Sequence, residues 1–199
     1  MIRNIIFDLG QVLFDFTPKN YLCQNFSNDK IEILMKEIFK EKEWKNLDKG
    51  ICSVDEAIES ISQRGRVEKG DVESILKNRK SIVTPIHENI QLLEDIKENG
   101  YRIFILSNFH RDLFDEFYNE IPLLHLADGK VISSYVNLLK PEKEIYSHIL
   151  KKYQLTPSET LFIDDAKHNI EAAEDFGIKG VHLRSPKMLK KELEDLEIL

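Results

Sequence analysis

Cysteine and long apolar segments are scarce in this 199-residue sequence. It contains two cysteines, Cys23 and Cys52, so we expect no disulfide framework and two isolated, buried thiols in a reducing compartment. Its apolar runs are far shorter than the ~20 residues that a transmembrane helix needs. The opening residues, MIRN, lead into an apolar run without the features of a signal peptide. We therefore expect a cytoplasmic protein with no membrane partner.

Positive charge is also in deficit. The chain carries 28 basic and 35 acidic residues, which gives a net charge of −7. A surface for nucleic acid or for anionic membranes needs a basic excess, so we expect neither partner. The length suits one hydrophobic core and a small second lobe. It leaves the oligomeric state, monomer or dimer, open.

The sequence does contain a set of apolar runs that end in polar residues. Apolar residues at 5–7, 103–106 and 161–163 are each followed by polar side chains, and helical patterns separate the runs. Such runs are typical of buried parallel strands, and open α/β sheets bind ligands at the carboxyl ends of their strands. We expect one crevice to collect Asp8, Ser107, Asn108, Asp164 and Asp165, together with Lys140, which precedes Pro141.

The spacing of the first two runs predicts an inserted domain. A helix over 85–99, capped by Thr84, begun by Pro85 and ended by Gly100, already provides the crossover to the next strand. A crossover needs only about a dozen residues, so most of the intervening segment is surplus, and it shows helical spacing without strand alternation. We expect a helical cap domain at 16–84 and an α/β catalytic core domain at 1–15 and 85–199.

The rest of the chain alternates between strand and helix patterns. This alternation predicts an α/β fold: a Rossmann-like parallel sheet sandwiched by helices, with a small all-helical cap inserted after the first strand. The expected later elements are helices over 111–120, 141–153 and 168–176, short strands over 130–134, 160–163 and 180–183, and a C-terminal helix.

The acids at the expected strand ends indicate a cation. Two carboxylates ~4 Å apart repel each other by about 4 kcal/mol at an effective dielectric constant of 20, and a hard cation such as Mg²⁺ converts that repulsion into binding. Lys140 stands at the positive end of the helix expected from Pro141, where a cation is disfavoured by about 0.3–1 kcal/mol. Such local conflicts tend to mark functional positions. We expect a site for a phosphate and a divalent cation.

Four motifs resemble those of the haloacid dehalogenase-like hydrolase superfamily, in its branch of phosphatases with a small helical cap. The motifs are IIFDLGQVL at 5–13, ILSN at 105–108, LKPEKEIY at 139–146 and FIDDAKHNIEAA at 162–173. The cap segment WKNLDKGICS at 44–53 also resembles this branch, including its sugar-phosphate phosphatases of the α-glucose-1-phosphate type. The resemblance covers essentially the whole chain and implies a phosphatase that acts on a small phosphorylated metabolite.

The resemblance implies a nucleophile and a magnesium site. Asp8 would attack phosphorus in line and form an aspartyl-phosphate. The implied Mg²⁺ ligands are the other Asp8 oxygen, the backbone carbonyl of Gly10, Asp165 and, often through water, Asp164. Positioning and electrostatic stabilisation dominate a transfer of this type.

The resemblance also implies a set of phosphate contacts. Ser107 would donate a hydrogen bond to a phosphoryl oxygen and Lys140 would neutralise it, which makes both of them catalytic residues beside Asp8. Asn169 would support these contacts. The implied phosphate-binding residues are Ser107, Asn108, Lys140 and Gly10.

Gly10 departs from the family pattern. Most phosphatases of this family carry a second Asp two residues after the nucleophile, and that Asp protonates the leaving group. General acid catalysis is worth about 10²–10⁴-fold. Its loss favours leaving groups that carry negative charge readily, such as those of acyl phosphates and sugar-1-phosphates. Asp15 could replace the acid, although a residue in its position more often caps or hinges.

Several other side chains have two interpretations. Arg64, Arg66 and Lys69 form either a solvated charge run, which we favour, or a basic cluster for the substrate. His110 either lines the entrance of the site or lies in a solvated loop. Trp44 belongs to the core of the cap more readily than to a stacking platform.

Three other functions fit parts of the pattern. A metal-independent 2-haloacid dehalogenase also lacks the second Asp, since a departing halide needs no proton, but it leaves the acid pair at 164–165 unexplained. A weakly active binding or regulatory member of the family would keep the scaffold without efficient turnover. A receiver-type signalling domain has the same chemical groups, but in another order along the chain and without a cap.

Overall fold

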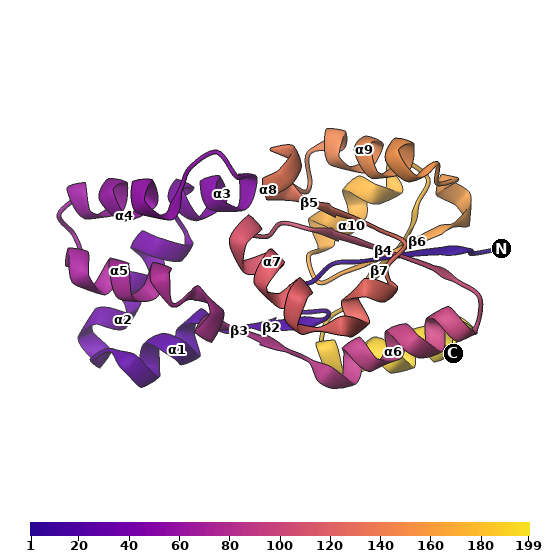
Figure 1. The fold of residues 1–199 in the computed structure, drawn as a ribbon, viewed down its shortest axis with the longest axis horizontal. Coiled ribbons are helices and arrows are strands. Elements are labelled where there is room, and N and C mark those ends of the chain that lie inside the picture. The colour runs from indigo at the N-terminus through magenta and orange to yellow at the C-terminus, as the bar shows by residue number, and fades with distance from the viewer.

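The computed structural model describes residues 1–199 and shows two lobes joined by a narrow ribbon (Figure 1). The larger lobe contains a five-stranded parallel sheet in the order β5-β4-β1-β6-β7. Its strands are β1 (Asn4–Phe7), β4 (Arg102–Ser107), β5 (Gly129–Ile132), β6 (Thr160–Asp164) and β7 (Lys179–His182). The predicted α/β class with a parallel sheet is confirmed.

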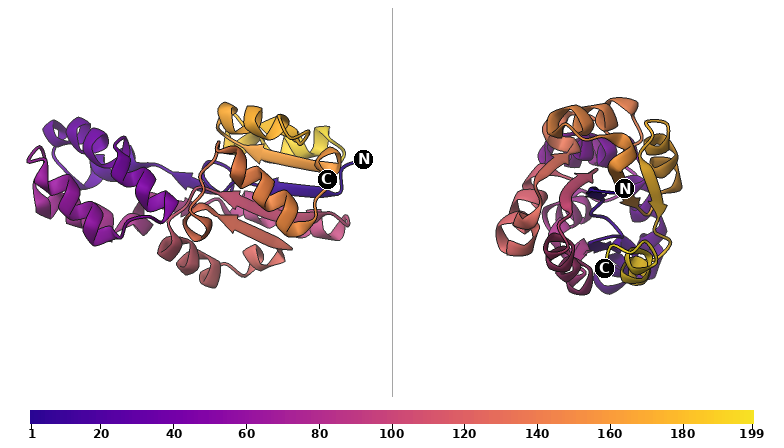
Figure 2. Two further views of the ribbon diagram at one scale, coloured as in Figure 1. Left: turned by 90° about the horizontal axis from the view of Figure 1, so that it is seen from above. Right: turned by 90° about the vertical axis from the view of Figure 1, so that its right-hand side faces the viewer.

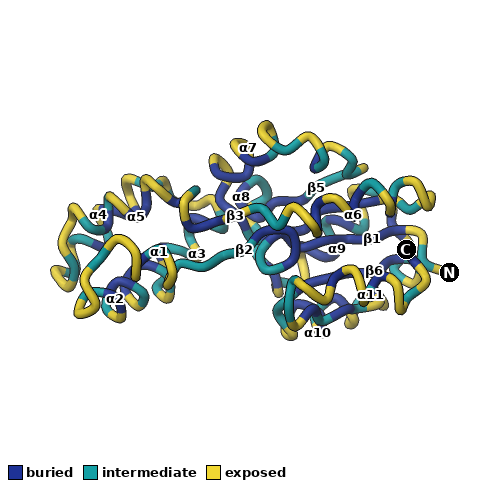
Figure 3. The backbone as a smooth tube through the Cα atoms, turned by 90° about the horizontal axis from the view of Figure 1, so that it is seen from below, coloured by how far each residue is buried: buried dark blue, intermediate teal, exposed yellow.

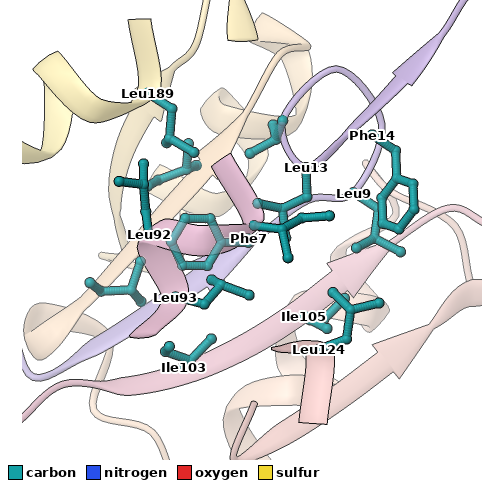
Figure 4. Packing of buried hydrophobic residues seen from close by; sticks show 14 of the residues in the cluster. Phe7, Leu9, Leu13, Phe14, Leu92, Leu93, Ile103, Ile105, Leu124 and Leu189 are labelled. Atoms are coloured by element: carbon teal, nitrogen blue, oxygen red, sulfur yellow. The ribbon is translucent and has the colours of Figure 1, made fainter. Parts of the chain in front are cut away.

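Helices cover both faces of this sheet because side chains alternate along each strand. Ile5 and Phe7 of β1 enter one hydrophobic cluster, and Ile6 enters the other. The first cluster is covered by α6 (His87–Glu98), α7 (Arg111–Glu120), η3 (Pro122–Leu126) and α11 (Leu189–Asp195). The second is covered by α9 (Lys143–Tyr153) and α10 (Lys167–Glu174). Figure 4 shows Phe7 packed among leucines of α6 and α11.

Short elements complete the larger lobe. They are α8 (Ser133–Val136), η4 (Pro157–Glu159) and η5 (Pro186–Met188). The helices and strands expected between residues 111 and 183 lie within two residues of their observed bounds, and the C-terminal helix is present but ends at Asp195, four residues before the end of the chain. No helix of the structure combines the length and the apolar character that crossing a membrane takes.

The smaller lobe is helical and has a hydrophobic cluster of its own, which includes Leu22, Ile38, Ile61 and Leu76. Its elements are α1 (Pro18–Asn25), α2 (Asn28–Leu34), η1 (Met35–Phe39), α3 (Lys42–Lys49), α4 (Val54–Gln63), α5 (Lys69–Lys77) and η2 (Arg79–Ile82). Figure 2 shows this lobe extending from one end of the sheet, and Figure 3 shows its helices buried inside and exposed outside.

A two-stranded antiparallel ribbon joins the lobes. It pairs β2 (Phe14–Phe16) with β3 (Val83–Pro85). The sequence pattern predicts no strand here and assigns Thr84 and Pro85 to the start of a helix; both predictions are wrong, since α6 begins at His87 after Ile86. Three residues are too few to show alternation. The predicted domain boundaries fall within this ribbon, and the division itself stays a prediction.

Two local expectations also need correction. Helix α9 begins at Lys143 with Glu142 as its N-cap, so Lys140 and Pro141 lie in the preceding loop and the helix-dipole argument for Lys140 is wrong. Both cysteines are free, as predicted, but Cys23 is exposed on α1 and Cys52 is half-buried. The expectation of buried thiols is therefore wrong, because the polar face of α1 carries Cys23.

Candidate active site

The expected site residues converge at the carboxyl ends of three neighbouring strands. Strand β1 lies between β4 and β6 and pairs with both in parallel. Asp8 directly follows β1, Ser107 ends β4 and Asp164 ends β6. All three residues are buried. A shared strand direction therefore places a carboxylate, a hydroxyl and a second carboxylate at one edge of the sheet.

Asp8, Asp164 and Asp165, here called the carboxylate cluster, each bring one carboxylate oxygen within 4.8 Å of the others. Burial raises the pKa of Asp8 to about 7; Lys140 opposes this rise and Asp164 adds to it. Burial and Asp164 also raise the pKa of Asp165. The cluster is short of positive charge. Its hard oxygen donors fit Mg²⁺, which prefers carboxylates, waters and phosphate oxygens.

Lys140 places an ammonium group inside this cluster. Its Nζ lies 2.8 Å from Asp8 Oδ1 and 2.6 Å from Asp164 Oδ2, and its side chain is 1% exposed. Burial disfavours the charged form, but Asp164 and Asp8 outweigh burial and raise the pKa of Lys140. The Asn108 Nδ2 donates to the Lys140 carbonyl at 3.0 Å, and the Lys140 N–H donates to Asn108 Oδ1 at 2.9 Å. The end of β4 therefore fixes the backbone that carries the lysine.

The adjacent acids Asp164 and Asp165 have different surroundings. The Asp164 side chain is fully buried. Its Oδ1 accepts hydrogen bonds from the Ala166 N–H at 2.8 Å and from Asn169 Nδ2 at 3.0 Å, and its Oδ2 accepts one from Lys140 Nζ. Asp165 is more exposed and lines the neighbouring pocket. Asp164 thus orients Lys140, whereas Asp165 faces the space where a ligand can enter.

Gly10, two residues after Asp8, faces open space. A Cβ atom at this position would meet no atom within 4 Å, and its φ lies outside the left-handed region. The turn uses Gln11 instead, whose φ is 53° and whose N–H donates to the Phe14 carbonyl at 2.6 Å. A larger residue would therefore fit at position 10.

A pocket of ≈ 190 Å³ opens beside the carboxylate cluster, between the two lobes. Its size exceeds that of an engineered apolar cavity of about 150 Å³ that binds benzene, so it has room for one small ring. The lining residues are Gly10, Gln11, Phe14, Phe16, Trp44, Asp48, Val83, Asn108, Phe109, His110, Leu113 and Asp165. None is Lys or Arg, so the pocket suits an uncharged group.

Asp48 and His110 meet in the wall of this pocket, one from each lobe. His110 Nε2 lies 3.2 Å from Asp48 Oδ1, at angles that do not make a hydrogen bond. His110 is 4% exposed, and its ring centre lies 4.7 Å from that of Trp44. Trp44 contacts the hydrophobic cluster of the cap as well as the pocket. His110 is therefore a pocket residue, and Trp44 belongs to the core of the cap, as favoured, and also lines the pocket.

Helix α3 is fixed to the larger lobe beside this pair. The Ser133 hydroxyl donates to the Asp48 carbonyl and accepts from the Phe109 N–H at 3.0 Å. Lys49 Nζ lies 2.7 Å from Oε1 of Glu142, the N-cap residue of α9. One buried hydroxyl therefore connects the backbone of Asp48 with the backbone next to His110.

Some candidates lie away from the pocket. Asp15 accepts a hydrogen bond from Gln11 Nε2 at 3.1 Å within the ribbon and does not line the pocket. Arg64 and Arg66 pair with buried glutamates of the cap. Asp48 was not among the expected site residues, although its position directly before Lys49-Gly50, in the cap segment with a family resemblance, was a usable signal.

A family model of haloacid dehalogenase-like hydrolases matches residues 5–183. This range contains the helical lobe and all of the strand ends described above. The chain belongs to the haloacid dehalogenase-like hydrolases. The predicted family, and with it the prediction of a hydrolase, is confirmed.

Two relatives of this haloacid dehalogenase-like hydrolase are phosphatases. A sesquiterpene phosphatase from Aspergillus oryzae is 23% identical, and the match covers 96% of this chain and 94% of the relative. D-ribitol-5-phosphate phosphatase from Bacteroides thetaiotaomicron is 27% identical, with 90% of each chain covered.

A solved structure shares the fold. It is a HAD family enzyme from Bacteroides thetaiotaomicron in complex with magnesium and inorganic phosphate. The TM-score is 0.72 at 22% identity, with 91% of this chain and 93% of that chain covered. The arrangement of sheet and cap is therefore common to both proteins.

Proposed function

We propose that this hydrolase is a Mg²⁺-dependent phosphatase that releases phosphate from a small metabolite through an aspartyl-phosphate at Asp8. One observation carries the proposal: three carboxylates cluster beside an open pocket with a single buried ammonium group, which contacts two of them. A divalent cation and a phosphate would balance this excess of negative charge. The two relatives that are phosphatases support the same reaction.

We assign Mg²⁺ to Asp8, Asp165 and the Gly10 carbonyl, with Asp164 acting through a water. Asp164 takes the outer position because its oxygens already accept hydrogen bonds from the chain. When bound, the ion neutralises charge on the phosphoryl oxygens and on the carboxylates around it. The magnesium and phosphate complex of the structural neighbour supports this assignment.

Asp8 is held in one orientation for attack on phosphorus. Its Oδ1 accepts a hydrogen bond from the Leu9 N–H at 2.7 Å and lies 2.8 Å from Lys140 Nζ. The same ammonium group can neutralise a phosphoryl oxygen, and the buried Ser107 hydroxyl can donate to another. Asn108 contributes by holding Lys140. Such preorganised charges act strongly in a site that excludes water.

The pocket supports a substrate whose remainder is small and uncharged. It has no Lys or Arg for a second anionic group, while Phe16 and Trp44 offer ring faces and Gln11 offers an amide. A sugar-1-phosphate meets this description and remains the substrate class we propose, since its leaving oxygen carries negative charge more readily than an ordinary alkoxide and depends less on an acid at position 10. The cytoplasmic location and the lack of nucleic-acid and membrane partners remain predictions.

The variant Asp8→Asn tests the proposed function. It should lower the turnover of p-nitrophenyl phosphate by on the order of 10⁶-fold, the scale seen when a covalent nucleophile is removed. The wild type should lose activity in EDTA, regain it with Mg²⁺, and bind beryllium fluoride at Asp8. Turnover that survives in Asp8→Asn or in EDTA would contradict the proposal.

A 2-haloacid dehalogenase is the second candidate, and Gly10 is the observation that favours it, because halide departure needs no proton. The carboxylate cluster favours the phosphatase, since dehalogenation has no use for a cation. Release of chloride from a 2-haloacid in EDTA would establish the dehalogenase. If both substrate classes bind without turnover, the protein is a binding or regulatory member of the family.

A further inference from the structure

The proposed phosphatase reaction has one requirement that the strand ends do not meet. A basic leaving oxygen needs a proton as its bond to phosphorus breaks, and Gly10 has no side chain to provide one. We propose, on the basis of the proposed function, that Asp48 of the cap is the proton donor and that His110 is its positioning residue. The acid would then come from the helical lobe instead of the loop after β1.

Asp48 is the pocket side chain best placed for this role. The lining residues that can exchange a proton are Asp48, His110 and Asp165. Asp165 belongs to the carboxylate cluster, where a proton would compete with the cation. Both ring nitrogens of His110 are shielded from solvent. The Asp48 side chain is 18% exposed and lines the pocket, which leaves it as the candidate donor.

The surroundings of Asp48 hold it at the junction of the lobes. His110 Nε2 lies 3.2 Å from Asp48 Oδ1. Ser133 accepts from the Phe109 N–H and donates to the Asp48 carbonyl, so the acid and the imidazole depend on the same buried hydroxyl. The docking of α3 on the core therefore places the acid in the wall of the pocket.

The step balances as general acid–base catalysis. An Asp8 oxygen bonds to phosphorus while the bond between phosphorus and the leaving oxygen breaks. The electron pair stays with the leaving oxygen, which takes the proton of the Asp48 carboxyl group. Water then attacks phosphorus, the bond between phosphorus and the Asp8 oxygen breaks, inorganic phosphate leaves, and the proton that water loses returns to Asp48. His110 Nε2, 3.2 Å from Asp48 Oδ1, limits the positions that the carboxyl group can take during these two steps.

Leaving-group dependence tests this assignment. p-Nitrophenolate departs without a proton, whereas benzyl alkoxide is a strong base. In Asp48→Asn, kcat/KM for benzyl phosphate should fall by about 10²-fold or more relative to that for p-nitrophenyl phosphate. His110→Asn should move the same ratio in the same direction by a smaller factor. The matched control is Asp55→Asn, an exposed acid of the same lobe, which should leave the ratio unchanged.

Gly10→Asp provides a rescue, because a side chain at position 10 enters open space. Added to Asp48→Asn, it should restore the benzyl-to-nitrophenyl ratio at least tenfold. An equal loss on both substrates in Asp48→Asn, or a rescued variant with an unchanged ratio, would overturn the assignment. Failure of the proposed function is distinguishable, because the wild type would then show no Mg²⁺-dependent turnover of p-nitrophenyl phosphate.

Discussion

Two buried groups of charged side chains, one in each lobe, are built in opposite ways. In the core, the carboxylate cluster has three acids and one cation, Lys140, which pairs with Asp8 and Asp164. In the helical lobe, the cap ion network pairs two glutamates with two guanidinium groups and consists of Glu37, Glu43, Arg64 and Arg66. The Glu37 side chain is fully buried and that of Glu43 is 3% exposed. The buried acids of the two groups therefore differ chiefly in how many cations they meet.

The number of cations near each buried acid decides whether its pKa is raised or lowered. Burial acts against the charge of Glu37, but hydrogen bonds from Arg66 and Arg64 outweigh it and lower the pKa of Glu37. Arg64 and Ser60 lower the pKa of Glu43 against burial in the same way. In the carboxylate cluster, burial dominates and the pKa of Asp8 rises.

The direction of the pKa shift distinguishes acids that stabilise the fold from acids that are candidates for ligand binding. A buried acid that is paired with a cation adds little beyond a fixed geometry, and breaking the pair is expensive. An acid that is underpaired in a pocket is maintained by the rest of the fold and is a candidate for ligand binding. The carboxylate cluster meets the second description, and the cap ion network meets the first.

The largest expected effect comes from removing an acid from the underpaired group. Binding of Mg²⁺ to the native state at 100 times its Kd should add about 2.7 kcal/mol of stability, or about 5–10 °C in melting temperature for a chain of this size. Asp165→Asn should abolish this shift and lower turnover by more than about 10²-fold, because even outer-shell changes at metal sites cost about 10–100-fold. Differential scanning fluorimetry with Mg²⁺ or EDTA measures the shift.

Glu43→Gln is the control for this comparison. It also removes one buried acid, but from the balanced group, so the Mg²⁺-dependent shift should survive in it. An Asp165→Asn protein that keeps the full shift would place the cation elsewhere.

The second effect comes from removing a cation from the balanced group. Arg64→Met leaves Glu43 without its guanidinium partner and should lower the free energy of unfolding by about 3–5 kcal/mol. Arg66→Met should cost about 1 kcal/mol or less, because its side chain is 54% exposed and Glu37 keeps Arg64. Urea unfolding of both variants gives the two values, and equal losses would show that the network is not organised around Arg64.

Local patterns predict the core and most of the strand-end residues. Asp8, Ser107 and Asp164 each follow an apolar run, and the geometry of a parallel sheet brings such positions together without further information. The crossover length likewise predicts that a segment is inserted after the first strand.

Contacts between distant segments are what the sequence does not reveal. Arg64 pairs with Glu37, 27 residues earlier, so both interpretations of the basic cluster, a solvated run and a substrate site, miss its role in the cap ion network. The contact between Asp48 and His110 exists only because α3 docks on the core. The ribbon pairs two strands of three residues that are far apart in the sequence, and strands this short have no recognisable sequence pattern.

The smallest expected effect is on the pH dependence of stability, and it follows from the lowered pKa of Glu43. In the wild type the pKa of Glu43 is lowered in the folded state, so its contribution to stability is present above the unfolded value of about 4.3 and is lost as pH falls through the folded value. In Arg64→Met the hydrogen bond from Ser60 remains, but the lowering by Arg64 is lost, so burial raises the pKa of Glu43 above its value in the folded wild type. The variant therefore gains less stability than the wild type as pH rises through this range.

The difference in unfolding free energy between wild type and Arg64→Met should therefore widen from pH 4 to pH 7, by about 1.4 kcal/mol for each unit that separates the two folded pKa values. Urea unfolding at pH 4, 5, 6 and 7 in EDTA measures it, and the carboxylate cluster cancels because both proteins contain it unchanged. A constant difference would mean that Glu43 reaches solvent or another partner once Arg64 is gone. Glu43 would then not depend on Arg64 for charge compensation. The comparison between the lobes would then depend only on the raised pKa values of the carboxylate cluster.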